Sequence, residues 1–426
     1  MQVCWTLVYT DWWRLNLNWW RQVQIQGSSG LGQAWGRRSG RGIIRGMMPT
    51  GRSSSRGRPA ALLVLLLMTL AAACGGAAET AKSPAAVSDP LAAEIEQAAA
   101  FLQSDAAAQG PWAQSREGSL RELGRAQDAL RAGRRTLAMF RFSTVKANLA
   151  TAAYLSEHAT GKDMAAFEAE WKRMGGALKG DLGALSPAAL DGVHPAAVRA
   201  VGETALPQIR GYYEASLDYG RSTAPAEGLY YLASAQAQRD LARFARTLSA
   251  PASRREPPLR SIAQELDALE SEMLAAYRPP ASIEKHPQFI AASSALKEAR
   301  ELDAAGLCYG ALLRYLQAAV RFAPLRQDQP ALSGDALARR LGEFEKRLAV
   351  GDVDHSLGQL FAEIARSDID GTPADTAGTP SAVAPIAAGI AADVLPRYFA
   401  AIEPARPAPA RPAPKVTVTL VRWPFT

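Results

Sequence analysis

Apolar residues recur at spacings of three and four along most of the chain, and no other feature restricts its fold as strongly. The segment from Leu259 to Tyr277 is the clearest case, with large apolar or aromatic residues at positions 259, 262, 266, 269, 273 and 277. This spacing places those side chains on one face of an α-helix. Between residues 89 and 366 no convincing alternation typical of a β-strand appears. The sequence therefore predicts an all-α body over 89–366, an array or bundle of about a dozen helices joined by short turns.

Two segments of this body have similar sequences at a separation of 78 positions, and we call this internal similarity the echo. They begin at Gly228 and Gly306, and both end in the tripeptide Arg-Phe-Ala. Physically, such a glycine permits a tight turn, a small alanine lets helices approach, and an aromatic side chain fills the gap above it. The two segments also share Leu229 and Leu307, Tyr231 and Tyr309, and Ala233 and Ala311. A weaker third copy consists of Gly133, Ala138 and Phe142.

The spacing of Gly306, Ala311, Tyr315 and Ala318 resembles the second half of a tetratricopeptide repeat (TPR). Ala295 stands where that family has a large residue, and the copies do not recur at the family's period of about 34 residues. Two architectures therefore stay open, a diverged array of TPR-like helical hairpins and a bundle packed by the same rules. The resemblance implies a concave surface that binds peptides or proteins.

A segment of different composition runs from Arg52 to Cys74. Arg52, Arg56 and Arg58 come first, an uncharged and largely apolar run follows from Ala60 to Ala73, and Cys74 ends it after three alanines. This order predicts a secretory signal peptide. The run of 14 residues is shorter than the about 20 that a membrane-spanning helix needs.

The end of this segment resembles the lipobox of bacterial lipoproteins. The resemblance implies a signal peptide over 47–73, cleavage before Cys74, and acyl chains that attach Cys74 to a membrane. Gly75 stands where an inner-membrane retention signal would have Asp, which favours the periplasmic leaflet of the outer membrane. Residues 74–88 are small and polar and predict a flexible, lipidated tether.

Residues 1–46 precede this complete signal and contain six of the nine tryptophans. Met47 or Met48 would give a signal peptide of normal length. We therefore interpret residues 1–46 as a disordered extension of the gene model, with translation starting at one of these methionines. The alternative interpretation is a Trp-rich helix that lies in a membrane interface.

The net charge of +7 belongs mostly to the first 74 residues. They contain nine of the 48 basic and one of the 41 acidic residues, which leaves 39 basic and 40 acidic residues. The mature chain is therefore near neutral, and we exclude nucleic acid as a partner. Cys308 is the one cysteine after Cys74, so the sequence predicts no internal disulfide.

The C-terminal part changes composition three times. Residues 367–403 predict a linker and a last helix disturbed at Pro396, and residues 404–414 are proline-rich and predict a semi-rigid spacer. Residues 415–426 contain two sets of side chains that alternate along the chain, as is typical of a β-strand. A single strand is not stable alone, so it must pair with another strand or stay disordered. We interpret this tail as a docking segment anchored by Trp423 and Phe425. The alternatives are a tail packed on its own helices and a disordered end.

The histidines and cysteines give no familiar catalytic or metal-binding pattern. No nucleophile elbow, phosphate loop or pair of metal-spaced ligands occurs, so we predict neither a cofactor nor a metal. Asp352, Asp354 and His355 form the densest acid–base group, and one of the two aspartates is more simply a helix N-cap. The scattered histidines and the cluster of tyrosines are His158, His194, His286 and His355, and Tyr212, Tyr213, Tyr219, Tyr230 and Tyr231.

These patterns together predict a lipid-anchored helical protein of the cell envelope that binds or scaffolds another envelope protein and is not an enzyme. The membrane partner is contacted through lipid on Cys74. The alternative is a helical small-ligand receptor or enzyme with a site between packed helices, for which the paired tyrosines or a polar pocket around His194, His286, Asp352 and His355 are candidates. A structural spacer between membrane and cell wall is a third possibility.

Overall fold

A computed structural model describes residues 89–158, 163–181, 186–222, 225–278, 283–326, 334–370 and 385–402. The chain divides into residues 1–87 and 88–426, and every described residue belongs to the second unit. These residues are helical and contain no strand, which confirms the predicted all-α class. Within them, β pairing is limited to an isolated parallel bridge between Arg255 and Val353.

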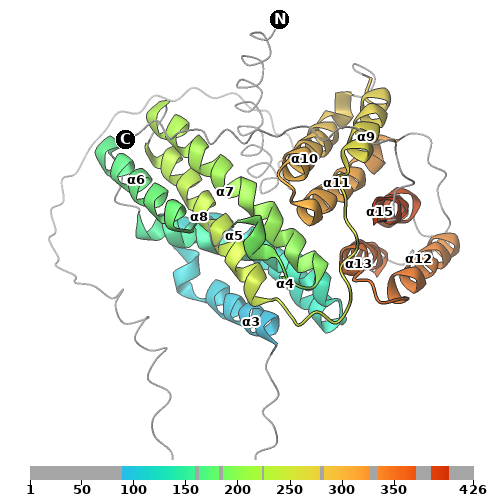
Figure 1. Ribbon diagram of the computed structural model, residues 1–426. Helices are drawn as coiled ribbons and strands as arrows, with labels where there is room; N and C mark the ends of the chain where they lie inside the picture. The colour runs from blue at the N-terminus through green and yellow to red at the C-terminus, as the bar shows by residue number, and fades with distance from the viewer. Residues whose placement is uncertain are drawn as a thin grey trace, which may run out of the picture. The chain divides into compact units, whose positions relative to one another are not determined.

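The helices follow one another along the chain, most of them after a short turn, but α8 and α9 are joined by a long non-helical connection over residues 248–262 (Figure 1). Their bounds are α3 Pro90–Gln103, α4 Gly110–Arg131, α5 Arg135–Glu157, α6 Met164–Asp181, α7 Ala196–Ser222, α8 Pro225–Thr247, α9 Ala263–Ala276, α10 His286–Ala304, α11 Cys308–Phe322, α12 Gly334–Ala349, α13 Ser356–Asp370, α14 Pro385–Gly389 and α15 Leu395–Ile402. Short 3-10 turns cover Asp105–Ala108, Pro187–Leu190, Ile283–Lys285 and Ala323–Leu325, and a π-helix covers Ile390–Val394.

Asp89 followed by Pro90 predicts the start of a helix, and apolar residues at spacings of three and four after it predict the buried face; α3 begins at this place. The side chain of Asp89 accepts a hydrogen bond from the backbone N of Leu91 at 3.0 Å, and Pro90 occupies the first helical position. An acceptor at the N-cap and a proline directly after it stabilise a helix start, because the first N–H groups have no partner in the helix. The predicted apolar face is buried and consists of Leu91, Ile95, Ala98 and Leu102.

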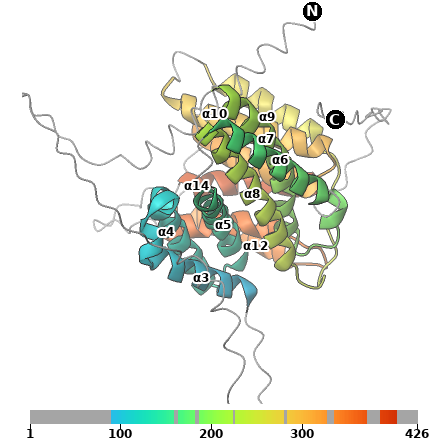
Figure 2. The same ribbon diagram turned by 90° about the vertical axis from the view of Figure 1, so that its left-hand side faces the viewer.

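Three consecutive pairs of helices pack along their length: α4 with α5, α7 with α8, and α10 with α11. The pairs join because α8 also packs on α5 and α11 packs on α7. Figure 2 shows α3, α4 and α5 packed together, with α8 next to them. The long helices α7 and α8 therefore form the centre of the described unit.

The echoed residues serve different purposes in their two copies. Gly306 has a φ of +75° in the turn before α11, as the turn prediction requires. Gly228 instead lies inside α8, where an added Cβ would come within 2.5 Å of the ring of Phe167 and 2.7 Å of the Cα of Gly220. The turn prediction is wrong for Gly228, because its missing side chain lets α6, α7 and α8 close around a buried phenylalanine.

The C-terminal helices differ from the prediction at one boundary. The helix α13 continues to Asp370, whereas the predicted linker begins at residue 367. Two side chains hold this last turn: Asp368 accepts a hydrogen bond from the backbone N of Ala387, and Asp370 pairs with Arg134. The predicted disturbance at Pro396 is present, since a π-helix directly precedes α15.

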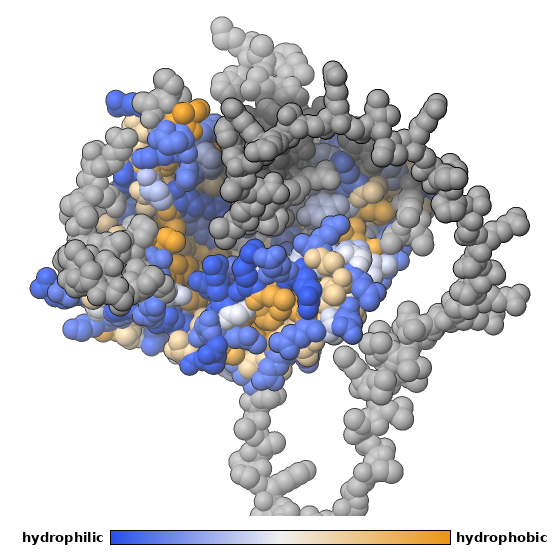
Figure 3. All heavy atoms as spheres, turned by 180° about the vertical axis from the view of Figure 1, so that it is seen from behind, coloured by the Kyte–Doolittle hydropathy of each residue, from blue (hydrophilic) through white to orange (hydrophobic). Residues whose placement is uncertain are grey.

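The face of the molecule drawn in Figure 3 is mostly hydrophilic where its residues are described. Figure 3 shows one face on which blue areas dominate and smaller orange areas lie between them. Large hydrophobic side chains that are exposed among the described residues are Met164, Tyr230, Leu274, Ile283, Val350 and Ile386. Single exposed apolar residues are ordinary for a folded protein. Among the described residues, none of the helices combines the length and the apolar character needed to cross a bilayer.

Candidate functional site

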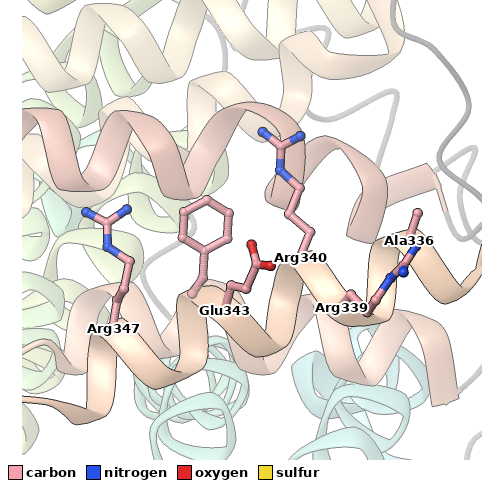
Figure 4. Close-up of a pocket in the computed structure, with 6 residues that line it drawn as sticks. Ala336, Arg339, Arg340, Glu343 and Arg347 are labelled. Atoms are coloured by element: carbon pink, nitrogen blue, oxygen red, sulfur yellow. The ribbon is translucent and has the colours of Figure 1, made fainter.

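One face of α12 borders an open groove with a volume of about 510 Å³ (Figure 4). Six residues line it, and we call it the arginine groove: Ala336, Arg339, Arg340, Glu343, Phe344 and Arg347. They recur at helical spacing over eleven positions, so the lining extends about 16 Å along the helix axis. Figure 4 shows Arg340, Glu343 and Arg347 reaching from α12 toward the neighbouring helix.

The buried side of α12 explains why the groove has this position. Leu337, Leu341, Phe344 and Leu348 are buried, which fixes the helix with its arginines turned outward. Phe344 stacks on Phe399 of α15, with ring centroids 5.9 Å apart. The guanidinium of Arg347 lies 3.8 Å above the ring of Phe399, within the range of a cation–π interaction. The groove therefore has an aromatic floor at one end and a cationic rim.

The cationic rim is incompletely neutralised by its own helix. Arg339 is exposed and Arg340 is half-buried, and no carboxylate among the described residues pairs with either of them. Glu343 supplies one negative charge against the three arginines of the lining. A guanidinium binds a carboxylate through two parallel hydrogen bonds, so this rim suits a ligand that carries carboxylates.

A smaller hollow of about 280 Å³ lies between α12 and α13. We call it the α12–α13 hollow; its polar lining consists of Arg134, Glu345, Gln359, Glu363 and Arg366. The Oε2 atom of Glu363 accepts a hydrogen bond of 2.7 Å from the backbone N of Leu137, in the first turn of α5. Burial raises the pKa of Glu363 to about 7, while that hydrogen bond and Arg134 lower it by smaller amounts.

A third polar group, the polar junction, joins the starts of α7 and α11 to the loop before α9. Glu203 is buried and accepts hydrogen bonds from Nε of Arg199 at 2.9 Å and from the backbone N of Gly310 at 2.8 Å. Burial raises the pKa of Glu203, against the lowering effect of these two donors. The hydroxyl of Tyr309 donates to Glu256 at 2.9 Å, and Arg199 lies 4.7 Å above the Tyr309 ring. No sequence motif points to this group, because its members come from three distant segments.

The four residues suggested for a polar pocket have separate contacts, and Asp352 forms an ion pair of 3.6 Å with Arg255. Nε2 of His194 lies 3.5 Å from Oε1 of Glu256 in the polar junction. Nδ1 of His286 lies 2.7 Å from the hydroxyl of Tyr277, and Nδ1 of His355 lies 3.0 Å from that of Tyr398. Burial lowers the pKa of His355. These contacts are of the kind that histidines and tyrosines make in packed helical cores.

The acid–base group before α13 caps helices. Asp354 Oδ1 accepts from the backbone N of Ser356 at 2.9 Å, so the predicted N-cap role is confirmed for Asp354. Its Oδ2 accepts from the backbone N of Ala196 at 2.6 Å, and the Ser356 hydroxyl accepts from the backbone N of Ala197 at 2.9 Å. One short segment therefore stabilises the starts of both α13 and α7.

The remaining histidine and the tyrosines take part in packing. The ring of His158 stacks on Tyr154 with centroids 4.2 Å apart. Tyr219 and Tyr231 pack between α7 and α8 with centroids 4.5 Å apart, and Tyr213 stacks on Trp171 of α6. These tyrosines therefore pack between helices.

Three predicted site residues, Cys74, Trp423 and Phe425, lie outside the described residues, so their roles stay predictions. Within the described ranges, no group of three or more histidine, cysteine or acidic side chains is placed to hold a metal ion. Burial raises the pKa of the Cys308 thiol, which favours its less reactive form.

No known family, no curated protein and no solved structure matches this chain. The function is therefore inferred from geometry and chemistry alone.

Proposed function

We propose that this protein is a lipid-anchored helical module of the cell envelope that binds an acidic segment of another envelope protein in the arginine groove. The anchor is Cys74, acylated after cleavage of the signal peptide. The acyl chains hold the body on the periplasmic side of a membrane, with the outer membrane favoured by Gly75. The lipidated tether of residues 74–88 connects the helical body to the acylated cysteine, so the body can contact a partner at some distance from the membrane.

The observation that carries the binding proposal is the incomplete neutralisation of the groove's rim. Arg339 and Arg340 face the groove without a carboxylate partner in the described part of the chain, next to the aromatic floor formed by Phe344, whose ring stacks on Phe399. An extended or helical acidic segment with one aromatic side chain supplies both the missing carboxylates and a group that packs on this floor. The groove's length of about 16 Å corresponds to three turns of α12, which suits a peptide better than a single small anion.

The test is binding of a fluorescent acidic peptide, rich in Asp and Glu and containing one Phe, to the purified protein. The double variant Arg339→Glu and Arg340→Glu should weaken binding at least tenfold, because it replaces attraction by repulsion. Raising the salt concentration should weaken the binding of the unaltered protein. The matched control is Lys346→Glu, which makes the same kind of charge change on the same helix but outside the groove, and it should keep most of the affinity.

Two further outcomes would overturn the proposal. Equal loss in the double variant and in the control would mean that overall charge, and not the groove, attracts the peptide. Binding of anionic vesicles in place of the peptide, or self-association through α12 in sedimentation, would assign the groove to a lipid surface or to a second copy. In cells, a photo-crosslinking residue at position 336 should capture one envelope protein, and the double variant should abolish that product.

A small-ligand receptor or enzyme is the second candidate, and the polar junction favours it. His194, Glu256, Tyr309 and Arg199 bring an imidazole, a carboxylate, a phenol and a guanidinium together beside a loop. Such a receptor should release a small molecule when the purified protein is denatured, and the variant Glu256→Gln should not. Release of the same compounds from both proteins would reject this candidate.

A further inference from the structure

The α12–α13 hollow is separate from the arginine groove and is built from three parts of the chain. Glu345 and Leu348 come from α12, Gln359, Ala362, Glu363 and Arg366 from α13, and Arg134 from the turn before α5. Two of its walls are apolar, formed by Leu348 and Ala362. The volume of about 280 Å³ admits a small organic molecule but not a folded segment.

The charges around the hollow are paired, with one exception. Both carboxylate oxygens of Glu345 accept from Arg366, at 2.7 and 2.8 Å. Arg134 pairs with Asp370. Glu363 has no cationic side chain in an ion pair among the described residues; its hydrogen bond to the backbone N of Leu137 occupies only one of its oxygens. The hollow therefore presents one carboxylate whose charge is balanced only by the start of a helix.

We propose that the α12–α13 hollow binds a small primary ammonium compound, with the carboxylate of Glu363 as its counter-ion. An ammonium group has three N–H donors. Glu363 and the side-chain carbonyl of Gln359 supply acceptors on α13, and the short alkyl chain packs against Leu348 and Ala362. Arg134 and Arg366 are already neutralised by Asp370 and Glu345, so their repulsion of a bound cation is weakened.

This binding depends on pH, because the carboxylate must be ionised. Burial raises the pKa of Glu363 to about 7. The other charged groups that face it are Arg134, Glu345 and Arg366. The ionised fraction of Glu363 rises from about one tenth at pH 6 to about nine tenths at pH 8, so the apparent affinity rises about tenfold. Binding at pH 7 also releases a proton from part of the molecules.

The experiment titrates the purified protein with butylammonium chloride and follows the backbone amides of Leu137 and Gln359 by NMR. We expect saturable shifts with a dissociation constant of about 1 mM at pH 8, and about tenfold weaker binding at pH 6. Calorimetry in two buffers of different ionisation enthalpy measures the proton release at pH 7. Butanol has the same size without the charge and should not bind.

The key variant is Glu363→Gln, which keeps an oxygen that accepts from Leu137 and removes the charge. It should weaken butylammonium binding at least tenfold and abolish the difference between pH 6 and pH 8. The matched control is Asp335→Asn, which removes one exposed carboxylate at the start of α12, outside both the hollow and the arginine groove, and should leave the affinity unchanged. Equal affinity in Glu363→Gln, equal binding of butanol, or no saturable shift up to about 20 mM would each overturn the proposal. None of these outcomes depends on what the arginine groove binds.

Discussion

Replacing Gly358 by alanine tests how closely α13 packs against the helices on either side of it. A Cβ at this position would lie 2.5 Å from Cε1 of Tyr398 and 2.6 Å from Cδ2 of Leu348. Both side chains are only 1% exposed, so neither has room to move without disturbing the core. Overpacking of this kind costs about 1–3 kcal/mol. Because Tyr398 precedes Phe399, the substitution should also loosen the aromatic floor of the arginine groove.

Gly342→Ala is the matched control, since it makes the same chemical change in α12 with nothing within 4 Å of the new Cβ. Inside a helix this substitution stabilises by about 0.5–1 kcal/mol. Urea unfolding followed by circular dichroism should therefore separate the two variants by about 1.5–4 kcal/mol, with opposite signs relative to the parent protein. A Gly358→Ala protein as stable as the parent would refute the packing of α13 described above.

Three further outcomes are expected. Burial raises the pKa of Glu363 to about 7 from the usual 4.5, so ionisation of this carboxyl destabilises the fold increasingly as the pH rises between those two values. In urea unfolding, Glu363→Gln should therefore raise the free energy of unfolding by about 1–2 kcal/mol at pH 8, after a discount for partial exposure, and by almost nothing at pH 4. An equal gain at both pH values would contradict this cause. Glu203→Ala removes the acceptor of Gly310 and Arg199 from a buried position and should cost about 3 kcal/mol, whereas a loss below about 1 kcal/mol would mean that water replaces the carboxylate. A chain that ends at Pro404 should lose at least one crosslinked envelope partner, and identical partners would count against docking by the C-terminal tail.

Local sequence determines the helices well where both the start and the buried face lie within a few residues. Asp89 and Pro90 predict the start of α3, and the spacing of three and four predicts its buried face. Local sequence does not determine the structural role of a glycine, because that role depends on which residues pack against it. Gly306 and Gly228 occupy equivalent positions in the echo, yet one makes a turn and the other makes room for Phe167. Phe167 is distant in sequence, so the pattern alone does not distinguish the two uses.

The candidate sites were beyond prediction for the same reason. The arginines of α12 are visible in the sequence, but the aromatic floor requires Phe399 from α15. The hydrogen bond from Leu137 to Glu363 spans 226 positions, and nothing near Glu363 indicates that its carboxylate is half-buried at the start of α5. Residue type suggests what a side chain can do, whereas its burial and its partners come from packing between distant segments.

The central claim is that acylation of Cys74 holds this helical body at a membrane. Metabolic labelling with radioactive palmitate, compared between the parent protein and Cys74→Ser, tests it most directly. We predict label on the parent protein in the membrane fraction and none on the variant, which should accumulate with its signal peptide uncut. Equal labelling of the two proteins, or an unlabelled parent protein, would contradict the claim.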